Sequence, residues 1–136
     1  MEKIKYIEHP SDVGFEVSGG TLEELFSNAA LALYSFMTDV DEIDITLERE
    51  IKIESEDLLS LMFDWIDELL FYFESESIVF KEFDIKIENF TLGGRCAGGI
   101  FDPEKHGSGI IIKAVTYHMM EVKKNDRWIA RVILDV

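Results

Sequence analysis

The sequence is poor in residues on which several classes of protein depend. Its 136 residues include a single cysteine, Cys96, which excludes an internal disulfide and a zinc site built from several cysteines. Basic residues are also scarce, since 13 lysines and arginines stand against 28 acids and give a net charge of −15. Nucleic-acid binding normally uses basic side chains to displace counterions from phosphates, so this charge argues against a general nucleic-acid binder. Binding to anionic membrane surfaces is disfavoured for the same reason.

Two kinds of hydrophobic segment are missing as well. The opening residues, MEKIKYIEH, lack the apolar stretch of a signal peptide, so we expect a cytoplasmic protein. The most apolar stretch, residues 57–74, contains Asp64, Asp67 and Glu68, and acids near the centre of a bilayer cost about 2.5–3.5 kcal/mol each. We therefore expect no transmembrane helix there. With 47% hydrophobic residues and no linker or repeat, residues 1–136 are expected to form a single domain.

Strand patterns outnumber helical ones. Helical spacing of apolar residues begins after a capping box at Thr21-Leu-Glu-Glu24 and recurs over residues 57–74. The segments expected to form strands are 4–7, 13–17, 47–54, 78–83, 84–90, 91–101, 110–122 and 127–134. Because strands and helices do not alternate regularly, the pattern predicts an α+β fold in which two helices pack on a mixed or antiparallel sheet. Either the sheet covers most sides of the second helix, or apolar surface is left for a partner.

Functional groups gather in three places: His9-Pro-Ser-Asp12, Lys113 to His118, and Asp135-Val136. Each has an ordinary structural interpretation, because an aspartate can cap a turn, a strand lysine can lie at an edge, and a terminus can be solvated. On a regular strand Lys113 and His118 face opposite sides. They could share one site only if a bulge lies between them.

A more specific arrangement follows if the last strand pairs beside the first turn. The carboxylates of Asp12 and Asp135 and the α-carboxylate of Val136 would then converge. Three anionic oxygens without a cysteine suit a hard cation such as Ca²⁺ or Mg²⁺, with Mn²⁺ as an alternative. Without a cation or a lysine, such a cluster would repel itself.

Known catalytic templates are absent from the sequence. It has no nucleophile elbow, phosphate loop or HExxH motif, and the glycine pairs at 93–94 and 98–99 do not open a helix. The acidic run at residues 39–44 predicts either a solvated loop or a surface that docks a basic protein.

Five segments, taken in order, resemble the archease family over nearly the full length. They are His9-Pro-Ser-Asp12-Val-Gly14-Phe-Glu16, Thr21-Leu-Glu-Glu-Leu-Phe followed by Ala29, Trp65-Ile-Asp67-Glu68-Leu-Leu70, Lys113-Ala-Val-Thr-Tyr-His118 and Val132-Ile-Leu-Asp135-Val136. The resemblance implies a small fold related to strand-helix-strand-strand (SHS2) modules. It also implies a protein cofactor, not an enzyme, which activates an RtcB-type RNA ligase in tRNA splicing by promoting its guanylylation and multiple turnover.

The resemblance also assigns roles to particular residues. Asp12, Asp135 and Val136 match positions where the family binds a divalent cation, most often Ca²⁺. Lys113 matches a position tied to activation of the ligase, and His9 and His118 match motif positions that we assign to the same role. The sequence departs from the family at residues 98–99, where Gly-Gly replaces the common Gly-Glu and removes a carboxylate.

Charge and resemblance lead to one hypothesis: the protein acts on the ligase rather than on RNA, presenting a cation and Lys113 to the guanylylation site. Two alternatives stay open. The first is a chaperone or adaptor for RNA- or DNA-modifying enzymes, with a structural metal and an essential second helix bearing Phe71 and Phe73. The second is a metal-dependent phosphoesterase that uses His9 or His118 as a base.

Overall fold

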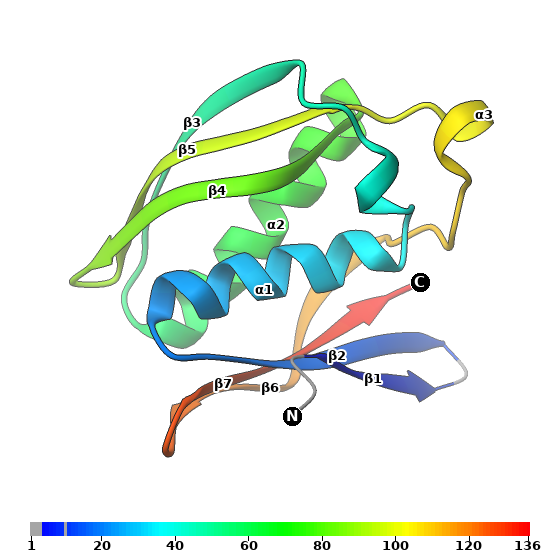
Figure 1. Ribbon diagram of the computed structural model, residues 1–136. Coiled ribbons are helices and arrows are strands. Elements are labelled where there is room, and N and C mark those ends of the chain that lie inside the picture. The colour runs from blue at the N-terminus through cyan, green and yellow to red at the C-terminus, as the bar shows by residue number, and fades with distance from the viewer. Residues whose placement is uncertain (1–3, 10) are drawn as a thin grey trace.

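The computed structural model describes residues 4–9 and 11–136 and places two long helices between two antiparallel sheets (Figure 1). The four-stranded sheet has the order β1-β2-β7-β6, and the three-stranded sheet has the order β3-β5-β4. The strands are β1 (Ile4–His9), β2 (Asp12–Gly19), β3 (Leu47–Glu54), β4 (Ile78–Glu88), β5 (Thr91–Ile100), β6 (Ala114–Lys124) and β7 (Trp128–Asp135). The helices are α1 (Leu22–Ser35), α2 (Leu58–Glu76) and the short η1 (Val40–Glu42) and α3 (Pro103–His106).

The predicted α+β class, with antiparallel strands and two long helices, is confirmed. Three local predictions were wrong. Residues 78–90 were expected as two segments, but β4 is continuous through an irregularity between Phe80 and Glu82. The strand expected over 110–122 begins only at Ala114, and residues 102–109, for which no helix was expected, contain α3. The strands also divide into two sheets rather than one. The sequence could not predict this division, because alternation shows which side of a strand is buried but not which strand lies beside it.

Side-chain caps begin both long helices. The hydroxyl of Thr21 accepts a hydrogen bond from the Glu24 backbone N–H at 3.1 Å, as the capping box predicts. Asp57 caps α2 in the same way, accepting from the Ser60 N–H at 2.7 Å. None of the helices in the described ranges is long and apolar enough to cross a membrane.

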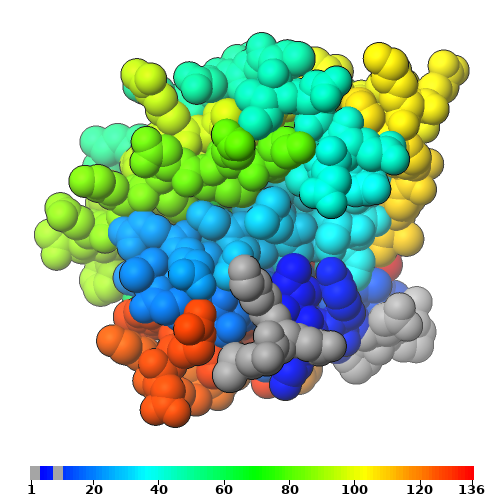
Figure 2. Space-filling model, viewed as in Figure 1, coloured from blue at the N-terminus to red at the C-terminus, as the bar shows by residue number. Residues whose placement is uncertain are grey.

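The core lies between the sheets and is continuous through both helices. Trp65 of α2 is fully buried, and its indole N–H donates to the backbone oxygen of Phe26 in α1 at 2.9 Å. Figure 2 shows the surface of α1 between the two sheets, so the layers leave this helix open on one side. The buried residues of α2 face the core, whereas Phe71 is 59% exposed. Both interpretations of the second helix therefore hold in part, since it is largely covered and still displays apolar surface.

Replacing Asp57 by alanine is expected to destabilise the protein near neutral pH. The bond from the Ser60 N–H lowers the pKa of Asp57 below its ordinary value of 3.8. Such a group stabilises the fold above its ordinary pKa, and the contribution is lost as the pH falls through the folded-state pKa. Thermal melting should therefore show a gap between wild type and Asp57→Ala that narrows in acid. A gap that stays constant from pH 7 to pH 2 would contradict this. The control Asp57→Ser keeps a cap that does not titrate.

Candidate functional site

The four-stranded sheet brings most of the predicted site residues to one end. Asp12, the first residue of β2, pairs with Asp135, the last residue of β7. Asp135 pairs in turn with Ala114, the first residue of β6, and Asp12 pairs on its other side with His9 at the end of β1. The predicted return of the last strand to the first turn is therefore confirmed.

The two aspartates face each other without a compensating charge. Directly opposed residues of antiparallel strands lie on one face, with Cβ atoms about 4.5–5.5 Å apart. In the described part of the chain, no ion pair involves either carboxylate. The Oδ1 atom of Asp12 is buried and has no hydrogen-bond partner among the described residues. A buried acceptor without a partner costs about 1–3 kcal/mol, so this end of the sheet is electrostatically unfavourable by itself.

Gly14 allows the strand pairing that creates this arrangement. A Cβ atom at this position would lie 2.6 Å from the Cδ1 of Ile133 and 2.6 Å from the backbone oxygen of Val132. Ile133 is 1% exposed. Glycine thus lets β7 lie close against β2, two residues from Asp12. The sequence motif contained Gly14, but its steric role is visible only in the paired strands.

Val136 follows Asp135 and is half-buried, with its side chain packed against the core. Because Val136 directly follows the last residue of β7, its main chain lies at the same end of the sheet. Within residues 4–9 and 11–136, no group of three or more histidine, cysteine, aspartate or glutamate side chains is placed to hold a metal. Two aspartates pair at the sheet end, and the predicted third ligand, the α-carboxylate of Val136, stays a prediction.

Lys113 lies immediately before β6 rather than within a strand, and its side chain is exposed. Its backbone N–H donates to the backbone oxygen of Asp135 at 2.8 Å, which anchors it at the same sheet end. The preceding loop is held by α1 instead of by the sheet. The N–H groups of Gly109 and Ile110 donate to the backbone oxygens of Met37 and Phe36 at 2.8 and 2.9 Å. This attachment explains why the predicted strand begins late.

His118 lies away from the aspartates, in a bulge of β6. Thr116 pairs with Ile133, and the next paired residue of β6 is Glu121, so residues 117–120 stand opposite Val132 alone. A bulge does occur, as a shared site with Lys113 would require, but it begins after Thr116 and includes the exposed His118. No described hydrogen bond or ion pair joins His118 to Asp12, Asp135 or Lys113.

His9 is placed by its backbone only. It pairs with Asp12 across the β1–β2 turn, so its Cα lies at the same end of the sheet. Its side chain and all of Pro10 lie outside what the structure describes. The predicted role of His9 therefore stays a prediction.

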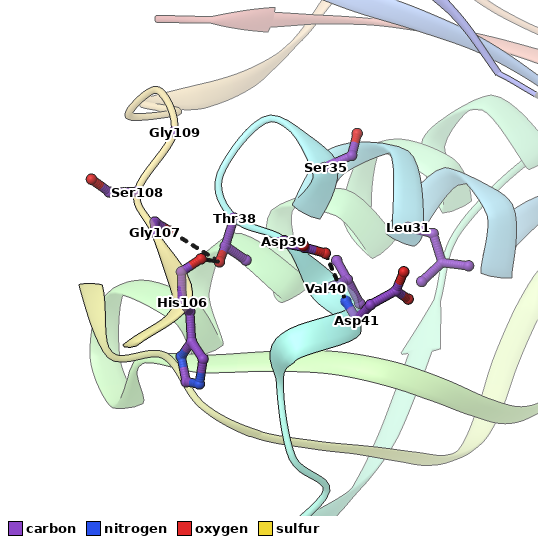
Figure 3. Close-up of a pocket in the computed structure, with 10 residues that line it drawn as sticks. All are labelled: Leu31, Ser35, Thr38, Asp39, Val40, Asp41, His106, Gly107, Ser108 and Gly109. Atoms are coloured by element: carbon purple, nitrogen blue, oxygen red, sulfur yellow. Dashed lines mark hydrogen bonds between the residues drawn. The ribbon is translucent and has the colours of Figure 1, made fainter. Parts of the chain in front are cut away.

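A separate pocket of about 650 Å³ lies at the C-terminal end of α1 (Figure 3). None of the predicted site residues lines it. The Thr38 hydroxyl is within hydrogen-bond distance of the backbone oxygens of His106 (3.1 Å) and Gly107 (3.2 Å), and the Asp102 N–H donates to Nδ1 of His106 at 2.9 Å. These polar groups hold the loop that leads to Lys113, so we assign them a structural role.

Cys96 has the properties of a core residue rather than a nucleophile. Its side chain is buried in β5, and desolvation raises the pKa of the thiol to about 12. The thiolate is therefore scarce at neutral pH, and the single cysteine offers no covalent chemistry.

Comparison with known proteins decides the family. A family model described as "Archease protein family (MTH1598/TM1083)" matches residues 5–136. The chain belongs to the archease family. Protein archease of Methanothermobacter thermautotrophicus is 42% identical over 140 residues, and that of Sulfurisphaera tokodaii is 38% identical over 139 residues. Both alignments cover 100% of this chain and 100% of the relative.

Two solved structures have the same fold. The solution structure of Methanobacterium thermoautotrophicum protein 1598 matches with a TM-score of 0.87 and 41% identity, covering 100% of both chains. The crystal structure of a Thermotoga maritima protein, described as "an archease, possible chaperone", matches with a TM-score of 0.67 and 26% identity. That match covers 96% of this chain and 94% of the Thermotoga chain. The family and the α+β fold implied by the sequence motifs are thus confirmed.

Replacing Asp12 by asparagine is expected to stabilise the protein when a chelator removes divalent cations. The substitution keeps the shape of the side chain and removes one of two opposed charges, worth up to about 1 kcal/mol between strands. The melting temperature should rise by roughly 3 °C in EDTA. Asp126→Asn, in the exposed β6–β7 turn, changes net charge equally and should melt like wild type. A lower melting temperature for Asp12→Asn would contradict the repulsion.

Proposed function

We propose that this chain is a protein cofactor that activates an RtcB-type RNA ligase, promoting its guanylylation and multiple turnover. The observation that carries the proposal is the sheet end where Asp12 opposes Asp135 beside Lys113. Membership of the archease family supports the choice of partner, through the activity that the sequence motifs imply.

Asp12, Asp135 and a main-chain oxygen of Val136 are the proposed ligands of a divalent cation. A buried, unpartnered carboxylate oxygen opposed by a second carboxylate fits a hard cation that takes oxygen ligands. We propose Ca²⁺, with Mg²⁺ or Mn²⁺ as alternatives. When bound, the ion would supply positive charge to phosphate oxygens of the partner's nucleotide.

Lys113 is the proposed contact to the nucleotide. Guanylylation joins a ligase side chain to the α-phosphorus of GTP and releases pyrophosphate, so negative charge develops on the leaving oxygen. The Lys113 ammonium is exposed, and its backbone is fixed by the bond to Asp135. A positioned ammonium with three donors stabilises such charge better than mobile water does.

The net charge of −15 favours a protein partner over RNA. A strongly acidic chain is repelled by phosphate backbones, whereas complementary charge speeds association with a basic protein surface. In this proposal RNA is held by the ligase, and the archease-family chain meets only the ligase.

The test is ligase guanylylation, measured as the rate at which GMP becomes attached to the ligase. Asp12→Asn and Lys113→Ala should each lower the stimulated rate about tenfold or more, because each removes a charge from the proposed site and a loss of about 1.4 kcal/mol is tenfold in rate. The matched control Lys86→Ala, an exposed lysine of the three-stranded sheet, should stimulate like wild type. Wild-type stimulation by both Asp12→Asn and Lys113→Ala would overturn the proposal.

A chaperone or adaptor with a structural metal is the second candidate. The exposed Phe71 favours it, and the Thermotoga relative is described as a possible chaperone. It differs in one outcome of the same assay. Asp12→Asn would retain full activity toward the partner once folded.

A further inference from the structure

Aromatic and methionine side chains lie along one side of α2 and in the bulge of β6 that this helix contacts through Phe63. Phe63 of α2 stacks on Tyr117 of the bulge, with ring centroids 4.0 Å apart and planes within 5°. Tyr117 is 54% exposed, Phe71 is 59% exposed and Met119 is 50% exposed. We call Phe63, Phe71, Tyr117 and Met119 the α2–β6 surface.

The bulge determines how the outer edge of β6 can contact another molecule. β6 is an outer strand, with β7 as its only neighbour in the described sheet. The bulge interrupts the backbone ladder, so the edge is poorly suited to adding another strand. Met119 adopts a φ of 52°, a conformation that bulky residues rarely take and that is often retained where it serves binding. Contact through side chains is therefore favoured over strand addition.

The charges that α2 carries beside this surface have one sign. α2 contains five acids and no basic residue. Asp67 is exposed and lies four residues from both Phe63 and Phe71, so it shares their side of the helix. Burial, and then the charge of Asp67, raises the pKa of Glu68, which a neighbouring cation would reverse. A second copy of this chain would bring the same acids to the contact and repel.

We infer that the α2–β6 surface docks a protein whose apolar pocket is bordered by lysine and arginine side chains. The inference rests on the proposed function, in which that protein is the ligase. Lys113 lies only four residues before Tyr117, roughly 13 Å along an extended strand. Docking at the bulge thus directs Lys113 and the sheet end toward the same partner. Buried aromatic side chains at the centre and polar groups at the rim are common in protein–protein contacts.

Binding of the complete chain to the ligase, measured by titration calorimetry, tests the apolar part of the surface. Phe71→Gln should weaken binding about tenfold or more, as loss of a central aromatic contact does. Phe90→Asn is the matched control, because Phe90 is also an exposed phenylalanine (42%) and its positive φ of 61° suits asparagine. It should bind like wild type. Equal binding by Phe71→Gln and wild type would overturn the inference.

Charge reversal tests the basic border of the partner. Asp67→Lys and Glu88→Lys change the net charge equally, but Glu88 lies at the end of β4 in the other sheet. Asp67→Lys should slow association and weaken its salt dependence more than Glu88→Lys does. Equal effects would mean that net charge alone matters and would overturn the docking surface.

The assay separates this inference from the proposed function. If Asp12→Asn binds the ligase but does not stimulate it, while Phe71→Gln fails to bind, the docking surface and the proposed function are both supported. If wild type binds through Phe71 without stimulating guanylylation, the docking surface stands and the proposed function fails. Docking is overturned if wild type forms no complex, or if Phe71→Gln instead converts a dimer of this chain into a monomer.

Discussion

The antiparallel pairing of β2 with β7 is the constraint on which both the fold and the candidate site depend. Phe15 and Val132 face each other on the side of this pair that the helices bury. A slip of one residue would turn these side chains away from the core, so the apolar pattern fixes the register. The same register sets Asp12 opposite Asp135. Burial of the core thus imposes an unfavourable meeting of carboxylates at the sheet end.

The fixed β2–β7 register gives a physical reason for proposing a cation and for proposing it between Asp12 and Asp135. The core stabilises the register far more than two opposed carboxylates destabilise it, so the repulsion persists until something offsets it. An ion held by Asp12 and Asp135 would link the neighbouring strands β2 and β7, and the Lys113 N–H is hydrogen-bonded to β7. The sheet is a stiff support, so it would hold the proposed ion in place before a partner binds.

Much of the fold could be predicted from local pattern. Alternation identified most strands, and the Thr21 cap marked the start of α1. The two sheets could not be predicted, because strand pairing depends on contacts far apart in the sequence. The bulge in β6 could not be predicted either. Residues 117–120 have no unusual sequence pattern, and the bulge is seen only from the strand pairing, in which Val132 alone stands opposite them.

The candidate site was partly predictable. The motifs named Asp12 and Asp135, whose pairing the structure confirms, whereas the cation and the Val136 ligand stay predictions. The late start of β6 was not foreseen, because hydrogen bonds from Gly109 and Ile110 to the end of α1 are long-range interactions. The exposure of Phe71 was undecided, because helical spacing shows which residues share a side but not what covers it.

The most direct measurement is a crystal structure grown with Mn²⁺, in which anomalous scattering locates the ion. We predict a peak between the carboxylates of Asp12 and Asp135, within coordination distance of a main-chain oxygen of Val136. A peak elsewhere, or none at saturating Mn²⁺ with the Asp12 oxygen satisfied by a protein donor, would contradict the account.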